Sequence, residues 1–435
     1  MMVQETYKTT WLANAPEHWN TLRIKNIFAE IDDRSETGKE ELLSVSHYTG
    51  VTKKKDSLAN EDDFISNAKT LVGYKKVAEN DLVSNIMLAW NGSLGISKYN
   101  GITSPAYCVY RIKGDNNPDY YGYLFSTAFM KAEFRKKSYG IIDSRLRLYS
   151  DKFFSIPAPV PPKTEQDQIV AYIKEQSKKI KHFIKKKQTF IALLKEQRQA
   201  VLNKAVTKGV NPNVKLKDSG IDWLGDIPEH WKVTKINGLC NFVRGNSSFK
   251  KDELLNKGKY VALQYGKTYK VDEVDENFQF YVNEEFYKST QTIKFGDIIV
   301  VSTSETIEDL GHSVFYNRND IGLLGGEQMA LKPYAENIDS KFLYYSSKVF
   351  TKSLQKFATG VKVFRFNINH LKTIYTSVPP KEEQAQIVLH IKTETAKIDQ
   401  AITQAQKEIE LIKEYKEAMI AEAVLGKFNH KIVKS

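Results

Sequence analysis

The chain has 435 residues, and its 64 Lys+Arg against 52 Asp+Glu give a formal net charge of +12. This length suggests about three domain-sized units with real cores, and the basic balance favours a polyanionic partner. Cys108 and Cys240 lie far apart without a CxxC spacing, which argues against a disulfide framework or a structural zinc, and no stretch approaches a membrane span, so we expect a soluble, cytoplasmic protein.

The sequence pattern of residues 1–160 predicts a β-rich, mixed domain. Short β-branched and aromatic runs alternate with turn residues, as in GYKKVAENDLVSNIM and WNGSLGISKYNGITSPAYCVYRI. The Asn80-Asp81 pair predicts a turn that enters a buried strand at Leu82. A helix-like stretch over 120–137, a glycine turn and a short strand close the segment.

Cations gather beside aromatic residues and the Gly140 turn at the end of this domain. A guanidinium fork can bind guanine O6 and N7 while neighbouring lysines hold phosphates. Ordinary surface charge is the alternative for each residue by itself. The candidate DNA-binding residues of the first domain are Lys131, Arg135, Lys136, Lys137, Arg145 and Arg147.

Residues 161–210 predict one uninterrupted helix. After Pro161-Pro162 there is no proline until Pro212 and no glycine until Gly209, and Glu165 lies in the opening turn. Apolar residues recur on a seven-residue frame, and so narrow a stripe requires a partner helix. The frame consists of Ile173, Ile180, Leu194 and Val201, with Ile184, Ile191 and Ala205.

This helical segment carries most of the net charge, with 12 basic side chains against 4 acidic ones. Lys185, Lys186 and Lys187 are candidates for a strip that lies along a phosphate backbone. A solvated helix face whose lysine stems cover apolar surface is the alternative interpretation.

Residues 211–378 repeat the first domain. WLGDIPEHW at 223–231 matches WLANAPEHW at 11–19, and Asp297 repeats the strand-entry turn of Asp81. A second cation cluster flanks the Gly360 turn, with Lys356, Lys362 and Arg365 as candidate DNA-binding residues. The interiors of the two domains otherwise show little identity, which suggests one task applied to two different targets.

Residues 379–435 repeat the helix, 218 positions later, and end in a short tail. PPKEEQAQIV at 379–388 matches PPKTEQDQIV at 161–170, and the heptad frame continues. Two such helices separated by a whole domain most simply pair antiparallel, each running roughly 65 Å. The second frame consists of Ile391, Ile398, Ala405, Ile412 and Met419, with Ile402, Ile409 and Ala423.

Sequence signatures of catalysis are missing. No GxxxxGK[ST] loop for ATP occurs, and no glycine-rich strand-to-helix turn suits S-adenosylmethionine. His18 and His230 share the PEHW motif without a second histidine at ligand spacing, which favours packing or capping over metal binding. The chain has the features of a binding protein, and we predict that it is not an enzyme and holds no metal.

The doubled PPxxEQ helix entry and the WLxxxPEHW openings resemble the specificity subunit of a type I restriction-modification system, over nearly the whole chain. The resemblance implies an α+β chain in which two target recognition domains (1–160 and 211–378) alternate with conserved spacer helices that pair as an antiparallel coiled coil. Each domain would read one half of a split, asymmetric site in double-stranded DNA, the first domain taking the 5′ half.

The resemblance also implies partners. The helices would dock two methyltransferase subunits, and restriction subunits would join through the complex of two methyltransferase subunits and one specificity subunit. S-adenosylmethionine, ATP and Mg would then be bound by those partner subunits, with no cofactor on this chain. Adenine methylation requires the base to be flipped out of the duplex, which a separate catalytic subunit would do.

Two other classes of function stay open on the residues alone. One is a non-catalytic coiled-coil scaffold with two protein-binding modules, and the other is a nuclease whose site is scattered along the chain. Salt-dependent binding to duplex DNA would count against the scaffold, because counterion release belongs to phosphate contact. Metal-dependent cleavage by the isolated chain would favour the nuclease.

Overall fold

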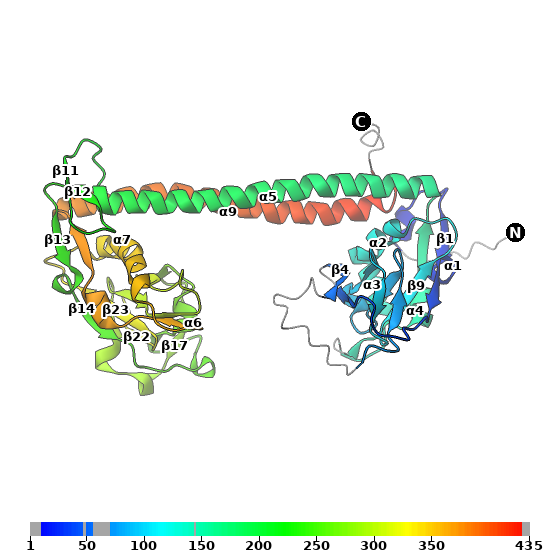
Figure 1. Cartoon of the computed structure of the whole chain (residues 1–435), viewed down its shortest axis with the longest axis horizontal. Helices are drawn as coiled ribbons and strands as arrows, with labels where there is room; N and C mark the ends of the chain where they lie inside the picture. The colour runs from blue at the N-terminus through cyan, green and yellow to red at the C-terminus, as the bar shows by residue number, and fades with distance from the viewer. Residues whose placement is uncertain (1–9, 47–48, 55–69, 143–144, 429–435) are drawn as a thin grey trace. The chain divides into compact units, whose positions relative to one another are not determined.

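The computed structural model describes residues 10–46, 49–54, 70–142 and 145–428. The chain forms two compact units, of which unit 1 comprises residues 1–188 and 406–435 and unit 2 comprises residues 189–405. Each unit combines one β-rich domain with part of both long helices, α5 (Lys163–Lys208) and α9 (Lys381–Ala423), drawn in green and in orange to red in Figure 1. The predicted α+β architecture is confirmed.

Unit 1 is built on a four-stranded antiparallel sheet in the order β2–β9–β6–β7. Aromatic residues of this sheet and of the helices that follow it fill the core, including Tyr110, Tyr120 and Phe153. The sheet strands are β2 (Phe28–Ile31), β6 (Leu82–Ser84), β7 (Leu94–Ile96) and β9 (Cys108–Ile112), and the helices are α2 (Pro118–Ser126), α3 (Ala128–Lys137) and α4 (Ser150–Ser155). Further short elements are η1 (Leu12–Asn14), β1 (Asn20–Arg23), α1 (Ile24–Ile27), β3 (Leu43–Ser46), β4 (Gly50–Lys53), β5 (Lys75–Val77), η4 (Ala89–Asn91), β8 (Gly101–Thr103) and β10 (Pro157–Val160).

Unit 2 repeats this sheet as β14–β23–β19–β21 and extends it with β16, which runs parallel to β21. A second sheet has the order β17–β15–β22–β18, and its strands are interspersed along the chain with those of the first sheet. The strands are β14 (Cys240–Arg244), β15 (Tyr260–Leu263), β16 (Glu273–Val274), β17 (Tyr281–Val282), β18 (Thr292–Ile293), β19 (Ile298–Val301), β21 (Ser313–Tyr316), β22 (Gly322–Leu324) and β23 (Gln328–Pro333). Further elements are β11 (Leu216–Asp218), β12 (Asp226–Pro228), β13 (Lys232–Lys235), η6 (Ile236–Gly238), η7 (Lys251–Glu253), α6 (Tyr265–Thr268), η8 (Glu284–Phe286), η9 (Ser289–Gln291), β20 (Thr303–Ser304), α7 (Ser340–Phe350), η10 (Thr351–Phe357), β24 (Phe364–Arg365), α8 (Ile368–Lys372) and β25 (Tyr375–Val378).

The strand-entry turns predicted at Asp81 and Asp297 are present. Asn80 and Gly296 have φ of 71° and 90°, and each aspartate accepts a hydrogen bond of 2.9 Å from a backbone N–H three residues upstream. The strands that follow, β6 and β19, are buried along their whole length. The predicted helix over 120–137 is instead two helices, because Thr127 adopts an extended backbone and caps the start of α3.

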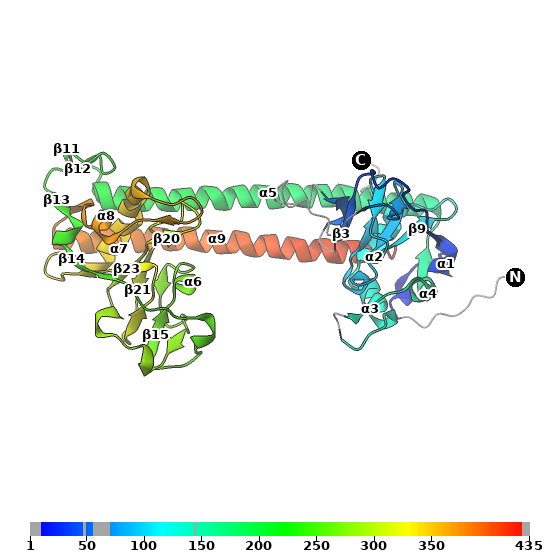
Figure 2. The same ribbon diagram turned by 60° about the horizontal axis from the view of Figure 1, so that its bottom comes forward.

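The long helices run antiparallel to each other. Lys187 pairs with Glu408 at 2.5 Å in unit 1, and Arg198 pairs with Asp399 at 2.9 Å in unit 2. As the residue number increases along α5, the number of its partner on α9 therefore decreases. Both views show α5 beside α9 (Figures 1 and 2). Buried seam residues include Ile173, Ile180, Ala205, Ile391, Ile398, Ala405, Met419 and Ala423.

The two repeated motifs bind each other at the start of each long helix. In unit 1 the Glu165 carboxylate accepts from the Trp19 indole N–H at 2.8 Å and contacts His18 Nε2 at 2.8 Å. In unit 2 Glu383 does the same with Trp231 at 3.0 Å and His230 at 2.8 Å. The PEHW motif and the PPxxEQ motif therefore form one clip between the domain and its helix.

The glutamine of PPxxEQ extends this clip. Gln166 is buried, donates through Nε2 to the Pro161 carbonyl at 2.9 Å, and accepts through Oε1 from the Asn117 N–H at the start of α2. Gln384 makes the same pair of bonds to Pro379 and Asp339 at the start of α7. One amide side chain thus satisfies backbone groups of two helix starts, which explains why Glu-Gln is repeated as a pair.

We expect Glu383→Ala to destabilise unit 2 by about 1–3 kcal/mol, because the indole N–H of buried Trp231 loses its acceptor. Urea denaturation followed by intrinsic fluorescence measures the change. Glu382→Ala is the matched control, since Glu382 is exposed and removes the same charge from the same helix turn. Equal stability of the two variants would mean that the clip is not a source of stability.

Candidate nucleic-acid interface

A glycine-turn hairpin lies at the same place in both domains. Tyr139 and Arg147 exchange backbone hydrogen bonds of 2.9 and 2.8 Å, and Thr359 and Arg365 exchange bonds of 3.0 and 2.9 Å. Gly360 has a φ of 116°, and a Cβ there would lie 2.0 Å from the Val363 carbonyl oxygen. Glycine is therefore required for this hairpin, and each hairpin presents an arginine at its closing pair.

The predicted cations of unit 1 fall on α3 and on this hairpin. Arg135 lies over the Trp90 ring at 5.1 Å, and Lys136 is 4.0 Å from Glu133. The Lys131 stem covers Gly92, and Arg147 Nη1 donates to the Leu146 carbonyl at 2.8 Å. Lys137 ends α3 and Arg145 is exposed on the hairpin, so the six candidates share one region of the unit.

In unit 2 the hairpin opens into a cleft of about 1150 Å³. The cleft lies where the loops after β14, β19 and β22 meet α6 and β24. Its lining carries cationic side chains from Arg244, Lys251, Lys267, Lys270 and Arg365. Among the predicted cations Arg365 lines the cleft, whereas Lys362 is exposed on the hairpin and Lys356 lies over the Phe357 ring at 5.2 Å.

Glycines bring the backbone close together at one wall of the cleft. A Cβ on Gly245 would lie 1.8 Å from the Gly325 carbonyl oxygen, and one on Gly325 would lie 2.5 Å from the Leu263 carbonyl oxygen. Neither position can accept a side chain without moving the backbone. The Gly325-Gly326 pair was visible in the sequence, but a glycine pair by itself also fits an ordinary turn.

Two buried polar atoms of this cleft have no hydrogen-bond partner among the described residues. They are Ser247 Oγ and Gln328 Oε1, on side chains that are 4% and 1% exposed. The Gln328 amide is held in place because its Nε2 donates to the Leu263 carbonyl at 2.6 Å. Buried polar groups are normally satisfied, so these two atoms are exceptions that adjoin the cleft.

The three lysines of the α5 run lie in three different environments. Lys185 lines a groove of about 1290 Å³ in unit 1, together with Lys131, over a floor that includes Ile180 and Ile184. Lys187 sits at a position of the heptad frame and pairs with Glu408. Lys186 is exposed. The run is therefore only partly a solvated face.

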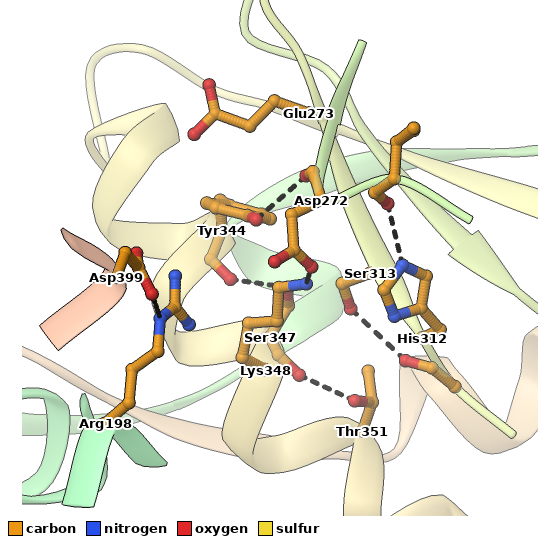
Figure 3. Close-up of polar contacts among 12 residues, drawn as sticks. Arg198, Asp272, Glu273, His312, Ser313, Tyr344, Ser347, Lys348, Thr351 and Asp399 are labelled. Atoms are coloured by element: carbon orange, nitrogen blue, oxygen red, sulfur yellow. Dashed lines mark hydrogen bonds and ion pairs between the residues drawn. The ribbon is translucent and has the colours of Figure 1, made fainter. Parts of the chain in front are cut away.

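Figure 3 shows the polar network that fixes α7 within unit 2. Lys348 Nζ contacts Asp272 at 2.5 Å, and the Tyr344 hydroxyl donates to the Asp272 carbonyl at 2.9 Å. His312 Nε2 lies 2.8 Å from the Val271 carbonyl, and burial lowers the pKa of both His312 and Lys348. Each group has a structural partner, so the network is a packing device for the domain.

Among the residues that the structure describes, no group of three or more His, Cys, Asp or Glu side chains could hold a metal ion. None of the described helices is long and apolar enough to cross a membrane. The features that gather are instead arginines and lysines beside glycine-lined, loop-built surfaces. Repeated domains with such cationic surfaces have the charge pattern typical of nucleic-acid-binding proteins.

Comparison with known proteins specifies this class. The family described as the type I restriction modification DNA specificity domain matches residues 16–191 and again residues 228–411. The chain belongs to this family and carries two copies of its domain. Its relatives are named specificity subunits, which are non-catalytic, so the chain is not an enzyme.

Individual relatives match nearly the whole chain or about half of it. The type I restriction enzyme MjaVIII specificity subunit of Methanocaldococcus jannaschii is 26% identical and covers 98% of this chain and 97% of its own. The EcoKI specificity subunit of Escherichia coli is 22% identical over 48% of this chain and 45% of its own.

Solved structures share the fold. A chain from a study of complex assembly and conformational transition of the type I R-M system has a TM-score of 0.69 at 14% identity, covering 95% of this chain and 99% of its own. The HsdS subunit from Thermoanaerobacter tengcongensis has a TM-score of 0.53 at 15% identity, covering 98% and 100%.

Proposed function

We propose that this chain is the sequence-specific DNA recognition subunit of a type I restriction-modification complex. One domain, within residues 1–160, reads the 5′ half of a split site in double-stranded DNA, and the other, within 211–378, reads the 3′ half. The observation that carries the proposal is that β2–β9–β6–β7 and β14–β23–β19–β21 repeat one sheet order while their loops carry different residues. A shared scaffold with different reading loops suits two different half-sites.

The spacer helices, within 161–210 and 379–435, set the gap between the half-sites and dock the methyltransferase subunits. Exposed leucines on the helices support docking, since Leu193 in unit 2 and Leu411 in unit 1 occupy equivalent repeat positions and are 56% and 52% exposed. An apolar position repeated once in each unit would give two copies of one partner equivalent contacts. Restriction subunits join through the methylase complex, and S-adenosylmethionine, ATP and Mg bind to those partners.

The proposal predicts two kinds of contact in the assembled methylase. Arg147→Ala should relax preference at one base position by ~1–3 kcal/mol, because a guanidinium fork on a hairpin suits base-edge contact. Replacing Lys185, Lys186 and Lys187 together by Ala should weaken binding to every duplex and flatten the dependence of log K on log salt, by about one unit for each phosphate that these lysines neutralise. Duplex binding measured across a salt series separates the two effects.

Two results would contradict this assignment. An unchanged salt dependence for the triple lysine variant would mean that these lysines do not contact phosphates and that Lys187 only pairs with Glu408. The absence of salt-dependent duplex binding by the assembled complex would instead favour the scaffold, in which the two domains bind proteins.

A further inference from the structure

Glu327 has an unusual charge for its place in the cleft of unit 2. Among the described residues that line the cleft it is the single acidic residue, and five lysine and arginine side chains line the cleft with it. Its side chain is half exposed and is not part of a packed core. A carboxylate on a surface that meets a phosphate backbone weakens binding through charge repulsion, unless it accepts a hydrogen bond from the nucleic acid.

The backbone of Glu327 is also strained. Its φ is 62°, a left-handed conformation that a non-glycine residue adopts at a cost, although the two preceding residues are both glycine. Strain of this kind persists where a side chain is needed at a particular place. Charge and backbone conformation therefore point independently to a function for the Glu327 side chain.

Neighbouring strands fix the direction of the carboxylate. Thr303 Oγ1 donates a hydrogen bond to Glu327 Oε2, and Thr303 is the cross-strand partner of Arg365 in the β20–β24 pair. Arg365 Nη2 lies 3.8 Å from the other carboxylate oxygen, Oε1. The guanidinium is 61% exposed, so the fork and the Oε1 acceptor are presented side by side at the cleft.

This pair is complementary to the major-groove edge of one base pair. A guanine offers two acceptors, N7 and O6, and the cytosine paired with it offers the N4 amino donor next to O6. Arg365 supplies the donors and Glu327 Oε1 supplies the acceptor, in the same order. We propose that Glu327 and Arg365 together read a single guanine–cytosine base pair in the 3′ half-site, an inference that rests on the proposed function of the chain.

The test uses the full chain assembled with its methyltransferase subunits, with the modified motif determined by long-read sequencing. Glu327→Gly and Arg365→Ala should each relax the same G·C position of the second half-site, lowering discrimination there by roughly tenfold or more. Glu327→Gly relieves the strain at this φ but removes the acceptor of the buried Thr303 hydroxyl, so its melting temperature is measured beside that of Glu327→Gln, which keeps an acceptor. Glu327→Gln should retain most of the discrimination, since its amide keeps an acceptor oxygen.

A base analogue tests the same contact on the DNA. 7-Deazaguanine at the read position removes N7 and should weaken binding of the unsubstituted complex but not of Arg365→Ala. Glu336→Gly is the control, because Glu336 is exposed after β23, outside the cleft, and removes the same charge.

The outcomes are distinct. The pairing of Glu327 with Arg365 would be overturned if the two variants relax different positions, if they relax an A·T pair, or if the second half-site does not change. In each of these cases a two-part motif would still support the proposed function. If the unsubstituted complex modifies no two-part motif, the proposed function fails and this inference fails with it.

Discussion

Exchanging residues 211–378 for the corresponding domain of another specificity subunit is expected to change one half of the methylated motif completely and to leave the other half as it was. The physical reason is that the sheets and loops of the two domains belong to separate compact units, each with its own core. The exchange points lie after Gly209, which ends α5, and before Lys381, which begins α9, so both long helices stay intact.

The donor domain must bring the clip with it. A tryptophan at the place of Trp231 is needed to meet Glu383, and the glycine at 209 must be kept because a Cβ there would lie 3.0 Å from Glu383 Oε1 and 3.2 Å from the Trp231 ring. The reciprocal exchange of residues 1–160 is the matched control and should change the other half. A change in both halves after either exchange would mean that the domains do not read independently.

Removing one matched heptad from each long helix should abolish modification at the original spacing. We suggest deleting Phe190–Glu196 from α5 and Ala401–Lys407 from α9, which keeps both the Lys187–Glu408 and Arg198–Asp399 pairs. Because Leu193 lies in the deleted heptad, assembly of the variant with the methyltransferase subunits is measured first. Seven residues at ~1.5 Å shorten each helix by roughly 10 Å, equivalent to about three base pairs at ~3.4 Å each. That shift also turns the duplex by roughly a quarter to a third of a revolution.

The shortened protein should therefore bind weakly or select the same two half-sites with a smaller gap. Duplicating the same two heptads is the control, and it should move the gap in the opposite direction. Deleting the heptad from one helix only should damage assembly, because the seam then loses its register. Full modification at the original spacing by a folded, assembled deletion variant would show that the helices do not set the gap.

Much of the fold could be predicted because the chain repeats its motifs and its heptad frame. The heptad frames predicted two helices, and α5 and α9 end at Lys208 and Ala423, close to Gly209 and Gly426. The turns before β6 and β19 were predicted because asparagine or glycine followed by aspartate is a local signal. The break between α2 and α3 was missed because Thr127 is an acceptable helix residue by propensity, and its capping role depends on tertiary context.

The candidate site was less predictable. Arg365 was named from its local context, but Glu327 reaches the same cleft from the turn before β23, Gln328 from the start of β23, and Ser247 from the loop after β14. Sequence spacing does not indicate such convergence when 38 residues separate Glu327 from Arg365. The bond between PEHW and PPxxEQ was missed for the same reason, although each motif was recognised, because Trp19 and Glu165 meet only through the fold.

We propose above that this chain selects a split DNA site. Modification mapping tests it most directly, by expressing the chain with its methyltransferase subunit in a host that lacks other adenine methylation and sequencing the DNA by a long-read method. We expect N6-methyladenine in both halves of one asymmetric motif, separated by a gap of fixed length and unspecified sequence. Methylation of a continuous motif, or methylation that does not depend on this chain, would contradict it.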